Sequence, residues 1–223
     1  MAKLIVIEGL DGTGKSTQVE KLGEYLSAKT KDVFRLKLPY YDDKSSTLVT
    51  MYLSGEMGSK PSDVNAFAAS TFYAADRYAS YKKHWGKEYV KDQFIIADRY
   101  TTSNASHQMT KLPKADWDFY LEWLFDFEYN KMQIPEPDLV IFLDMPVEVS
   151  QKLLSKRYEN DESKKDVHER DVSYLLSCRE AAKYTAEKLG WRKIKCSENG
   201  EALSIEEIAD MIIEQVEREF FNA

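Results

Sequence analysis

Residues 9–16 read Gly-Leu-Asp-Gly-Thr-Gly-Lys-Ser, a complete G-x-x-x-x-G-K-[ST] pattern. The apolar run 3–7 precedes it and is typical of a buried parallel strand, and residues 16–28 follow with apolar side chains on one helical face. Glycines let backbone N–H groups curve around phosphate oxygens, and a helix N-terminus attracts anions. This strand–loop–helix unit therefore predicts a phosphate-binding loop rather than a tight glycine turn with a surface lysine.

Two side chains of the loop have roles that follow from their chemistry. Lys15 can reach the β- and γ-phosphates of a nucleotide, and the Ser16 hydroxyl can ligate Mg²⁺.

The composition bounds the class of protein. The 223 residues suffice for one α/β domain, which we expect to span 1–223. A net charge of −7 argues against a nucleic acid polymer as partner, and no apolar run is long enough for a membrane span. Because the chain enters its first strand at once, we expect no signal peptide and a cytoplasmic location. Cys178 and Cys196 are isolated, so they predict neither a disulfide framework nor a zinc site.

Apolar, β-rich runs alternate with helical patterns along the whole chain. This order predicts a three-layer α/β fold, with a five-stranded parallel sheet flanked by helices on both faces. Ligands of such sheets bind at the carboxyl ends of the strands. The expected strands are 3–7, 33–38, 93–97, 138–143 and 191–196.

Asp98 and Arg99 follow the third expected strand. An acid at this point can steer Mg²⁺ or its waters, and the neighbouring guanidinium offers a fork for phosphate oxygens. A surface salt bridge that caps the loop is the alternative.

A long helical pattern over 64–84 is rich in alanine and aromatic residues. Tyr73 and Arg77 lie four residues apart on one face of it, so they could hold a flat base and its polar edge. Core packing plus a surface arginine is the simpler interpretation of this pair. Farther along, Asn104 could present its amide to a base edge, whereas His107 alone suggests only an ordinary imidazole.

Residues 156–170 form a charged segment without a hydrophobic face, which predicts either a mobile lid or a plain solvated loop. The next helix is expected to open there, with Asp166 as its N-cap and Glu169 three residues on.

Taken together, these segments resemble the thymidylate kinases, P-loop nucleoside monophosphate kinases that act on dTMP. The resemblance covers nearly the whole chain and rests on segments 7–17, 72–77, 98–104, 137–144 and 166–171. It implies Mg²⁺-dependent transfer of the γ-phosphoryl group of ATP to dTMP, which yields dTDP.

The resemblance also implies roles for single residues. The catalytic set would be Lys15, Asp11, Arg99, Arg157, Arg170 and Glu169. The ATP site would comprise Gly9, Asp11, Gly12, Thr13, Gly14, Lys15, Ser16, Thr17 and Arg157. The dTMP site would comprise Asp11, Tyr73, Arg77, Asp98, Arg99, Asn104 and His107. Ser16 and Asp98 would hold Mg²⁺.

Some positions depart from the family pattern. Residue 12 is glycine, so the loop supplies no arginine and the lid would provide the positive charge from Arg157, Lys164, Lys165 or Arg170. Tyr40 stands where many members carry an arginine, and His168 where some have tyrosine.

Two other functions remain open, the first of them because of Tyr40, His107 and His168. One is a kinase for another deoxynucleotide or a deoxynucleoside, and the other is a non-catalytic nucleotide-binding module. The aromatic helix and the resemblance both predict a homodimer.

Overall fold

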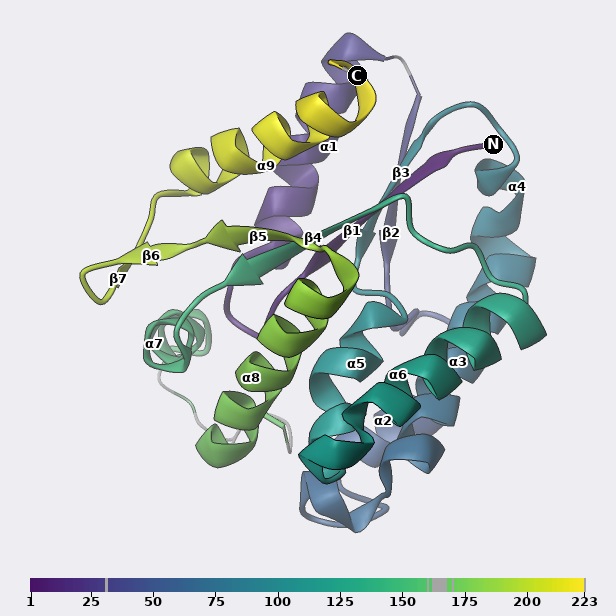
Figure 1. The fold of residues 1–223 in the computed structure, drawn as a ribbon, viewed down its shortest axis with the longest axis vertical. Helices are drawn as coiled ribbons and strands as arrows, with labels where there is room; N and C mark the ends of the chain where they lie inside the picture. The colour runs from purple at the N-terminus through teal and green to yellow at the C-terminus, as the bar shows by residue number, and fades with distance from the viewer. Residues whose placement is uncertain (31, 160, 162–167, 170, 223) are drawn as a thin grey trace.

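The computed structural model describes residues 1–30, 32–159, 161, 168–169 and 171–222. Its centre is a parallel sheet of five strands in the order β2-β3-β1-β4-β5 (Figure 1). The strands are β1 (Lys3–Glu8), β2 (Val33–Lys37), β3 (Phe94–Asp98), β4 (Leu139–Asp144) and β5 (Arg192–Lys195). A two-stranded antiparallel hairpin, β6 (Ser197–Glu198) and β7 (Glu201–Ala202), follows the last of them.

The register brings the carboxyl ends of the central strands to one edge. In β1, Ile7 pairs with Asp98 of β3 and with Ile141 of β4. The loops that leave β1, β3 and β4 therefore begin side by side.

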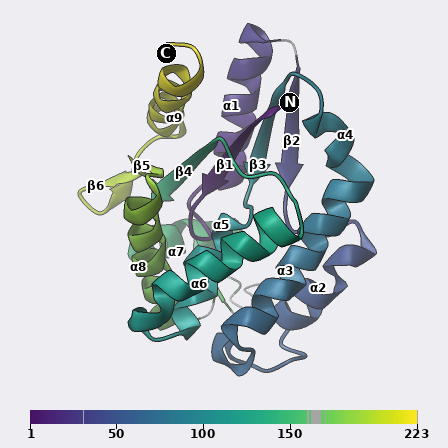
Figure 2. The same cartoon turned by 45° about the vertical axis from the view of Figure 1, so that its right-hand side comes forward.

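Helices cover both faces of the sheet (Figures 1 and 2). They are α1 (Lys15–Lys29), α2 (Thr47–Leu53), α3 (Ala66–Ser80), α4 (Gly86–Tyr89), α5 (Thr102–His107), α6 (Trp117–Phe125), α7 (Val147–Arg157), α8 (Val172–Leu189) and α9 (Ile205–Phe220). No helix in the described part of the chain is both long and apolar enough to cross a membrane.

Alternate residues of β1 pack into two separate hydrophobic cores, one on each face of the sheet. Ile5 and Ile7 pack with α1 and α9 on one face, whereas Leu4 and Val6 pack on the other face with Trp85 and other buried residues. Both sides of the strand are thus buried, as its continuous apolar sequence predicts.

The five predicted strands are confirmed, each to within one or two residues at either end. The expected helix over 64–84 is α3, which continues as a π-helical turn over Tyr81–Trp85. The prediction that Asp166 caps the following helix is wrong. That helix, α8, begins at Val172, and Asp171 is its N-cap, because its side chain accepts a hydrogen bond from Tyr174 N. Asp166 itself lies outside the described residues.

The loop after β1, which is predicted to bind phosphate, approaches α7 closely at Gly12. Gly12 adopts a left-handed φ of 79°, and a Cβ atom there would lie 2.5 Å from the backbone oxygen of Ser150 in α7. Gly14 has a similar φ of 82°, but a Cβ atom there would meet nothing within 4 Å.

These two glycines give a matched test of the fold. We expect Gly12→Ala to lower the free energy of unfolding by about 1–3 kcal/mol more than Gly14→Ala, because both variants incur the left-handed penalty and only one clashes with α7. Thermal unfolding of the two variants without nucleotide measures this difference. Equal melting temperatures would show that α7 moves to accommodate the added methyl group at little energetic cost.

Candidate active site

The loop after β1 wraps its own lysine. Lys15 Nζ donates a hydrogen bond of 2.7 Å to Leu10 O, and Thr13 Oγ1 donates to the same oxygen at 2.8 Å. Lys15 is only 7% exposed. Burial, followed by the nearby Arg99, lowers its pKa to about 8 despite the neighbouring acids. A buried cation whose own counter-charges only partly stabilise it is suited to receive an anionic ligand.

Ser16 and Asp98 meet at the mouth of this loop. Ser16 Oγ donates a 2.5 Å hydrogen bond to Asp98 Oδ2, although the two residues lie on different elements, α1 and β3. Both atoms are hard oxygen donors, and Mg²⁺ sites in nucleotide enzymes use one or two such groups together with phosphates and water. The pair therefore fits a magnesium ion. In the described part of the chain, no group of three or more His, Cys, Asp or Glu residues could hold a metal.

Arg99 is held in a strained backbone conformation directly after β3. Its φ is 70°, uncommon for a residue with a side chain. Arg99 Nη2 donates to Asp11 Oδ1 at 2.5 Å, and Nη1 lies 3.3 Å from His107 Nε2. Burial alone would raise the Asp11 pKa, but Arg99 and Lys15 hold it well below its usual range. The Arg99 guanidinium thus lies beside the Asp11 carboxylate at the edge of the sheet.

Glu8, at the end of β1, anchors the segment that follows Arg99. Its carboxylate is 1% exposed and accepts hydrogen bonds from Tyr100 N, Thr102 Oγ1 and Ser103 Oγ. Burial raises the pKa of Glu8, against the opposing effect of Arg99 and the hydroxyl donors. The start of α5 is therefore fixed relative to the phosphate-binding loop.

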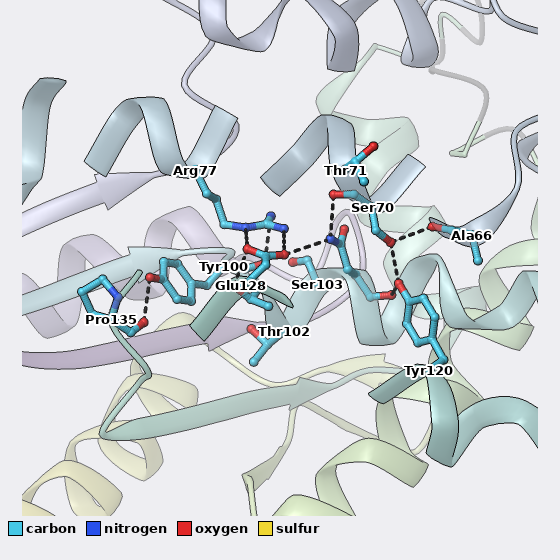
Figure 3. A network of polar contacts seen from close by, with 12 residues as sticks. Ala66, Ser70, Thr71, Arg77, Tyr100, Thr102, Ser103, Tyr120, Glu128 and Pro135 are labelled. Atoms are coloured by element: carbon cyan, nitrogen blue, oxygen red, sulfur yellow. Dashed lines mark hydrogen bonds and ion pairs between the residues drawn. The ribbon is translucent and has the colours of Figure 1, made fainter. Parts of the chain in front are cut away.

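A second buried carboxylate, Glu128, lies beneath the predicted base-reading residues (Figure 3). Arg77 is paired with it through Nε at 2.6 Å and through Nη2. Asn104 Nδ2 is 3.4 Å from both Glu128 Oε1 and Ser70 O. Burial opposes the charge of Arg77, but Glu128 outweighs it and raises the Arg77 pKa. The interpretation of Arg77 as a surface arginine is therefore wrong, since it is 3% exposed.

Two cavities open at this edge of the sheet. The loop cavity encloses ≈ 1740 Å³, including space open to solvent, and the helix cavity ≈ 590 Å³. Residues 11–18 of the loop, Asp98, Arg157 and Glu169 line the loop cavity. Tyr73, Arg77, Asn104, His107 and His168 line the helix cavity. The two cavities share Asp11, Leu38, Pro39, Tyr41 and Arg99.

Most of the site residues predicted from the sequence therefore converge here. Gly9 has a different place, since a Cβ atom there would lie 2.7 Å from Thr13 Oγ1, so this glycine permits close packing of the loop. Arg170, Lys164 and Lys165 lie outside the described residues. Tyr158 OH donates to Glu169 at 3.1 Å, which joins the two ends of the predicted lid.

The loop after β2 turns its first tyrosine away from the cavities. Tyr40 stacks on His84 with ring centroids 4.4 Å apart, whereas Tyr41 lines both cavities. The buried Asp76 of α3 accepts hydrogen bonds from Tyr40 N at 2.8 Å and Ser45 Oγ at 2.7 Å. Tyr40 therefore contacts α3 and His84 and is not among the residues that line either cavity.

A chain of polar groups lies behind the helix cavity. Lys111 Nζ donates to Tyr52 OH at 2.9 Å, and that hydroxyl is 2.8 Å from His168 Nε2. Burial lowers the pKa of His168 to about 3 and that of Lys111 to about 7, and it lowers the pKa of His107 well below its usual range. Both cavity histidines are therefore neutral at pH 7.

The lowered pKa of Lys111 predicts a specific pH dependence of stability. Between pH 7 and the unfolded value near 10.5, the unfolded chain binds a proton that the folded chain lacks, so folding gains stability as the pH rises. We expect the melting temperature of the wild type, relative to Lys111→Met, to increase between pH 7 and pH 10. An increase of about 1 kcal/mol in the free energy of unfolding corresponds to a rise of about 2–4 °C in the melting temperature for a chain of this size. A difference that stays constant with pH would contradict the assignment.

Comparison with known proteins connects this site to a family. The family model described as thymidylate kinase matches residues 7–208. A thymidylate kinase of Mycobacterium tuberculosis is 31% identical over 171 residues, which are 76% of this chain and 78% of the relative. A probable thymidylate kinase of Thermococcus gammatolerans is 29% identical over 224 residues, covering 100% of this chain and 99% of the relative.

A solved structure agrees at the level of the fold. Thymidylate kinase from Candida albicans superposes with a TM-score of 0.66 at 20% identity, covering 97% of this chain and 92% of that one. The sequence match extends from the end of β1 to the start of α9, so it includes the loop, both cavities and the lid segment. This chain belongs to the thymidylate kinase family.

Proposed function

We propose that the protein transfers the γ-phosphoryl group of ATP to the phosphate of dTMP, yielding dTDP and ADP. One observation supports this above all: the loop cavity and the helix cavity meet at Asp11 and Arg99. A donor in the first cavity and an acceptor in the second would bring their phosphates together at that point. Such proximity is the main requirement of phosphoryl transfer.

The donor phosphates would lie on the loop. Its backbone N–H groups and the N-terminus of α1 would bind the phosphate oxygens, and Lys15 would exchange its bond to Leu10 O for the β- and γ-phosphates. Ser16 and Asp98 would hold Mg²⁺, which neutralises charge on the bridged phosphates when bound. The remaining ATP contacts would come from Gly9, Asp11, Gly12, Thr13, Gly14, Thr17 and Arg157.

The chemistry at the junction consists of positioning and charge neutralisation. The acceptor phosphate is already ionised at pH 7, so no strong general base is needed. Arg99 would bind the acceptor phosphate, and Asp11 would keep the guanidinium in place until it arrives. Glu169 lines the loop cavity and is proposed to act near the acceptor, and Arg157 and Arg170 would supply lid charge. Lid closure would exclude water and so prevent hydrolysis of ATP.

The helix cavity would hold the nucleoside of dTMP. Tyr73 would stack on the base, Arg77 and Asn104 would contact its polar edge, and His107 would lie against the deoxyribose, where a 2′-hydroxyl would be crowded. Asp98 would complete the acceptor side through the metal. Two neutral imidazoles, those of His107 and His168, line this cavity, so the substrate panel below includes other acceptors.

We also propose that residues 1–223 form one domain, that two copies form a homodimer, and that the protein acts in the cytoplasm. The dimer is supported by exposed aromatic rings on neighbouring helices, with Tyr78 of α3 37% exposed and Phe119 of α6 62% exposed.

Arg99 gives the sharpest test of the reaction. We expect Arg99→Ala to lower kcat by about 10²–10³-fold, since it removes the guanidinium at the junction of donor and acceptor. Lys15→Ala should lower kcat by a similar factor. ADP release in a coupled assay with Mg-ATP and dTMP measures both, with the exposed Arg218→Ala as the matched control. Near wild-type turnover by folded Arg99→Ala would refute the proposed site.

The same assay identifies the acceptor. We expect fast turnover with dTMP and slow turnover with UMP, dCMP, dGMP and thymidine. Fast turnover with another acceptor would retain the phosphate chemistry but replace the base assignment. No acceptor-dependent turnover would favour the nucleotide-binding module.

The proposed dimer is tested by light scattering. At micromolar concentration we expect twice the chain mass of 25.8 kDa. Phe119→Glu should shift the mass to that of the monomer, because a charge on an apolar contact surface is costly. Val90→Glu is the matched control, since Val90 is 68% exposed and lies at the C-terminal end of another helix, α4. A monomeric wild type would reject the dimer.

A further inference from the structure

Glu128 occupies an unusual place for a carboxylate. It is 0% exposed, and it lies in a π-helical turn over Asp126–Lys131 that continues α6. Such turns are rare in proteins and are frequent at functional sites. Neither the phosphate-binding loop nor the cavity linings include this residue, so the reaction as described above gives it no role.

Donors from two separate segments, α3 and the start of α5, converge on this carboxylate. Oε2 accepts from Arg77 Nε at 2.6 Å and from Thr101 Oγ1 at 2.9 Å, and Oε1 accepts from Arg77 Nη2 and from Asn104 Nδ2. Figure 3 shows the Arg77 guanidinium alongside the Glu128 carboxylate, with Ser70 and Tyr120 to one side. Glu128 is therefore the common partner of the two residues proposed to contact the base.

These bonds determine which way the Asn104 amide faces. Its two near neighbours, Ser70 O and Glu128 Oε1, are both acceptors, so Nδ2 must point toward them. Within the described chain, no donor is hydrogen-bonded to Asn104 Oδ1. Because Asn104 lines the helix cavity, its carbonyl oxygen is the polar atom that it offers to a ligand there.

Arg77 is oriented by the same carboxylate. Its Nε and Nη2 are engaged by Glu128, and Nη1 makes only a long contact of 3.5 Å to Tyr100 O. The guanidinium has five N–H donors, so hydrogens on its Nη atoms stay available to the cavity that it lines. The cavity wall thus presents one acceptor, from Asn104, beside donors from Arg77.

We propose that Glu128 is a positioning residue that sets base selection by fixing this acceptor-and-donor pattern. A pyrimidine with an N3–H donor and a C4 carbonyl acceptor matches it, as thymine and uracil do. Cytosine presents the opposite pair, an N3 acceptor and a C4 amino donor, and leaves buried groups unpaired. The inference rests on the proposed base-contact roles of Arg77 and Asn104 and adds to them the residue that enforces their orientation.

Glu128→Gln tests this directly. A glutamine has the same shape but turns one of the two acceptors into a donor, which opposes either Arg77 or Asn104 Nδ2 and favours the flipped amide. We expect the ratio of kcat/KM for dTMP to that for dCMP to fall at least about tenfold, mainly through a higher KM for dTMP. Glu122→Gln, on the exposed side of α6, is the matched control and should leave the ratio unchanged. A folded Glu128→Gln enzyme that loses activity equally with both acceptors would overturn the proposal.

Asn104→Ala separates this inference from the one on which it rests. If Asn104→Ala leaves the ratio of dTMP to dCMP unchanged, the base-contact proposal itself is wrong. If Asn104→Ala lowers the ratio and Glu128→Gln does not, Asn104 contacts the base but Glu128 does not orient it.

A measurement on the wild type decides the matter if Glu128→Gln fails to fold. In ¹⁵N-labelled protein, the Asn104 side-chain N–H₂ protons should exchange slowly with water and shift little when dTMP is added, because they face Ser70 and Glu128. Fast exchange, or a large shift on adding dTMP, would mean that the amide nitrogen faces the nucleotide and would overturn the proposal.

Discussion

Buried carboxylates that each require several donors are the constraint on which the rest of the site depends. Glu8, Asp76 and Glu128 are all at most 1% exposed, and a polar group buried in this way is costly unless it is hydrogen-bonded. Their donors come from distant segments: Glu8 joins β1 to the start of α5, Asp76 joins α3 to the loop after β2, and Glu128 joins the end of α6 to α3 and α5. The helices α3 and α5 and the loop after β2 are thereby fixed around one edge of the sheet.

Much of this arrangement follows from the sequence, and the reasons are local. The loop, its lysine and its serine are contiguous, and each strand is a short apolar run next to a polar turn, so periodicity and motif spacing suffice to place them. Asp98 and Arg99 could be assigned to the ligand edge because parallel strands end there together. Such features need no knowledge of long-range contacts.

The parts that could not be predicted depend on contacts between distant residues. Glu128 stands in an aromatic-rich helix where an isolated acid suggests an exposed face, and its partner Arg77 is 51 positions away. The sequence predicts the start of α8 too early, because several acids precede this helix and the N-cap, Asp171, is identified only by its bond from Tyr174 N. The one hint in the sequence for the buried pair of Arg77 and Glu128 is an acid within a helical segment rich in aromatic residues.

Phosphate binding and base recognition would therefore depend on different parts of the chain. In the proposed function, phosphate binding would use the backbone of the loop after β1, where a side chain at Gly12 would strike Ser150 O of α7. Base contact would use Arg77 of α3 and Asn104 of α5, which both contact a single carboxylate in a π-helical turn, Glu128. A change at that carboxylate would alter which base fits while the loop, Lys15 and Arg99 stay in place. Under this proposal, acceptor preference could diverge while phosphate binding stays the same, since among the described residues the two cavities share no more than Asp11, Arg99 and the three loop residues Leu38, Pro39 and Tyr41.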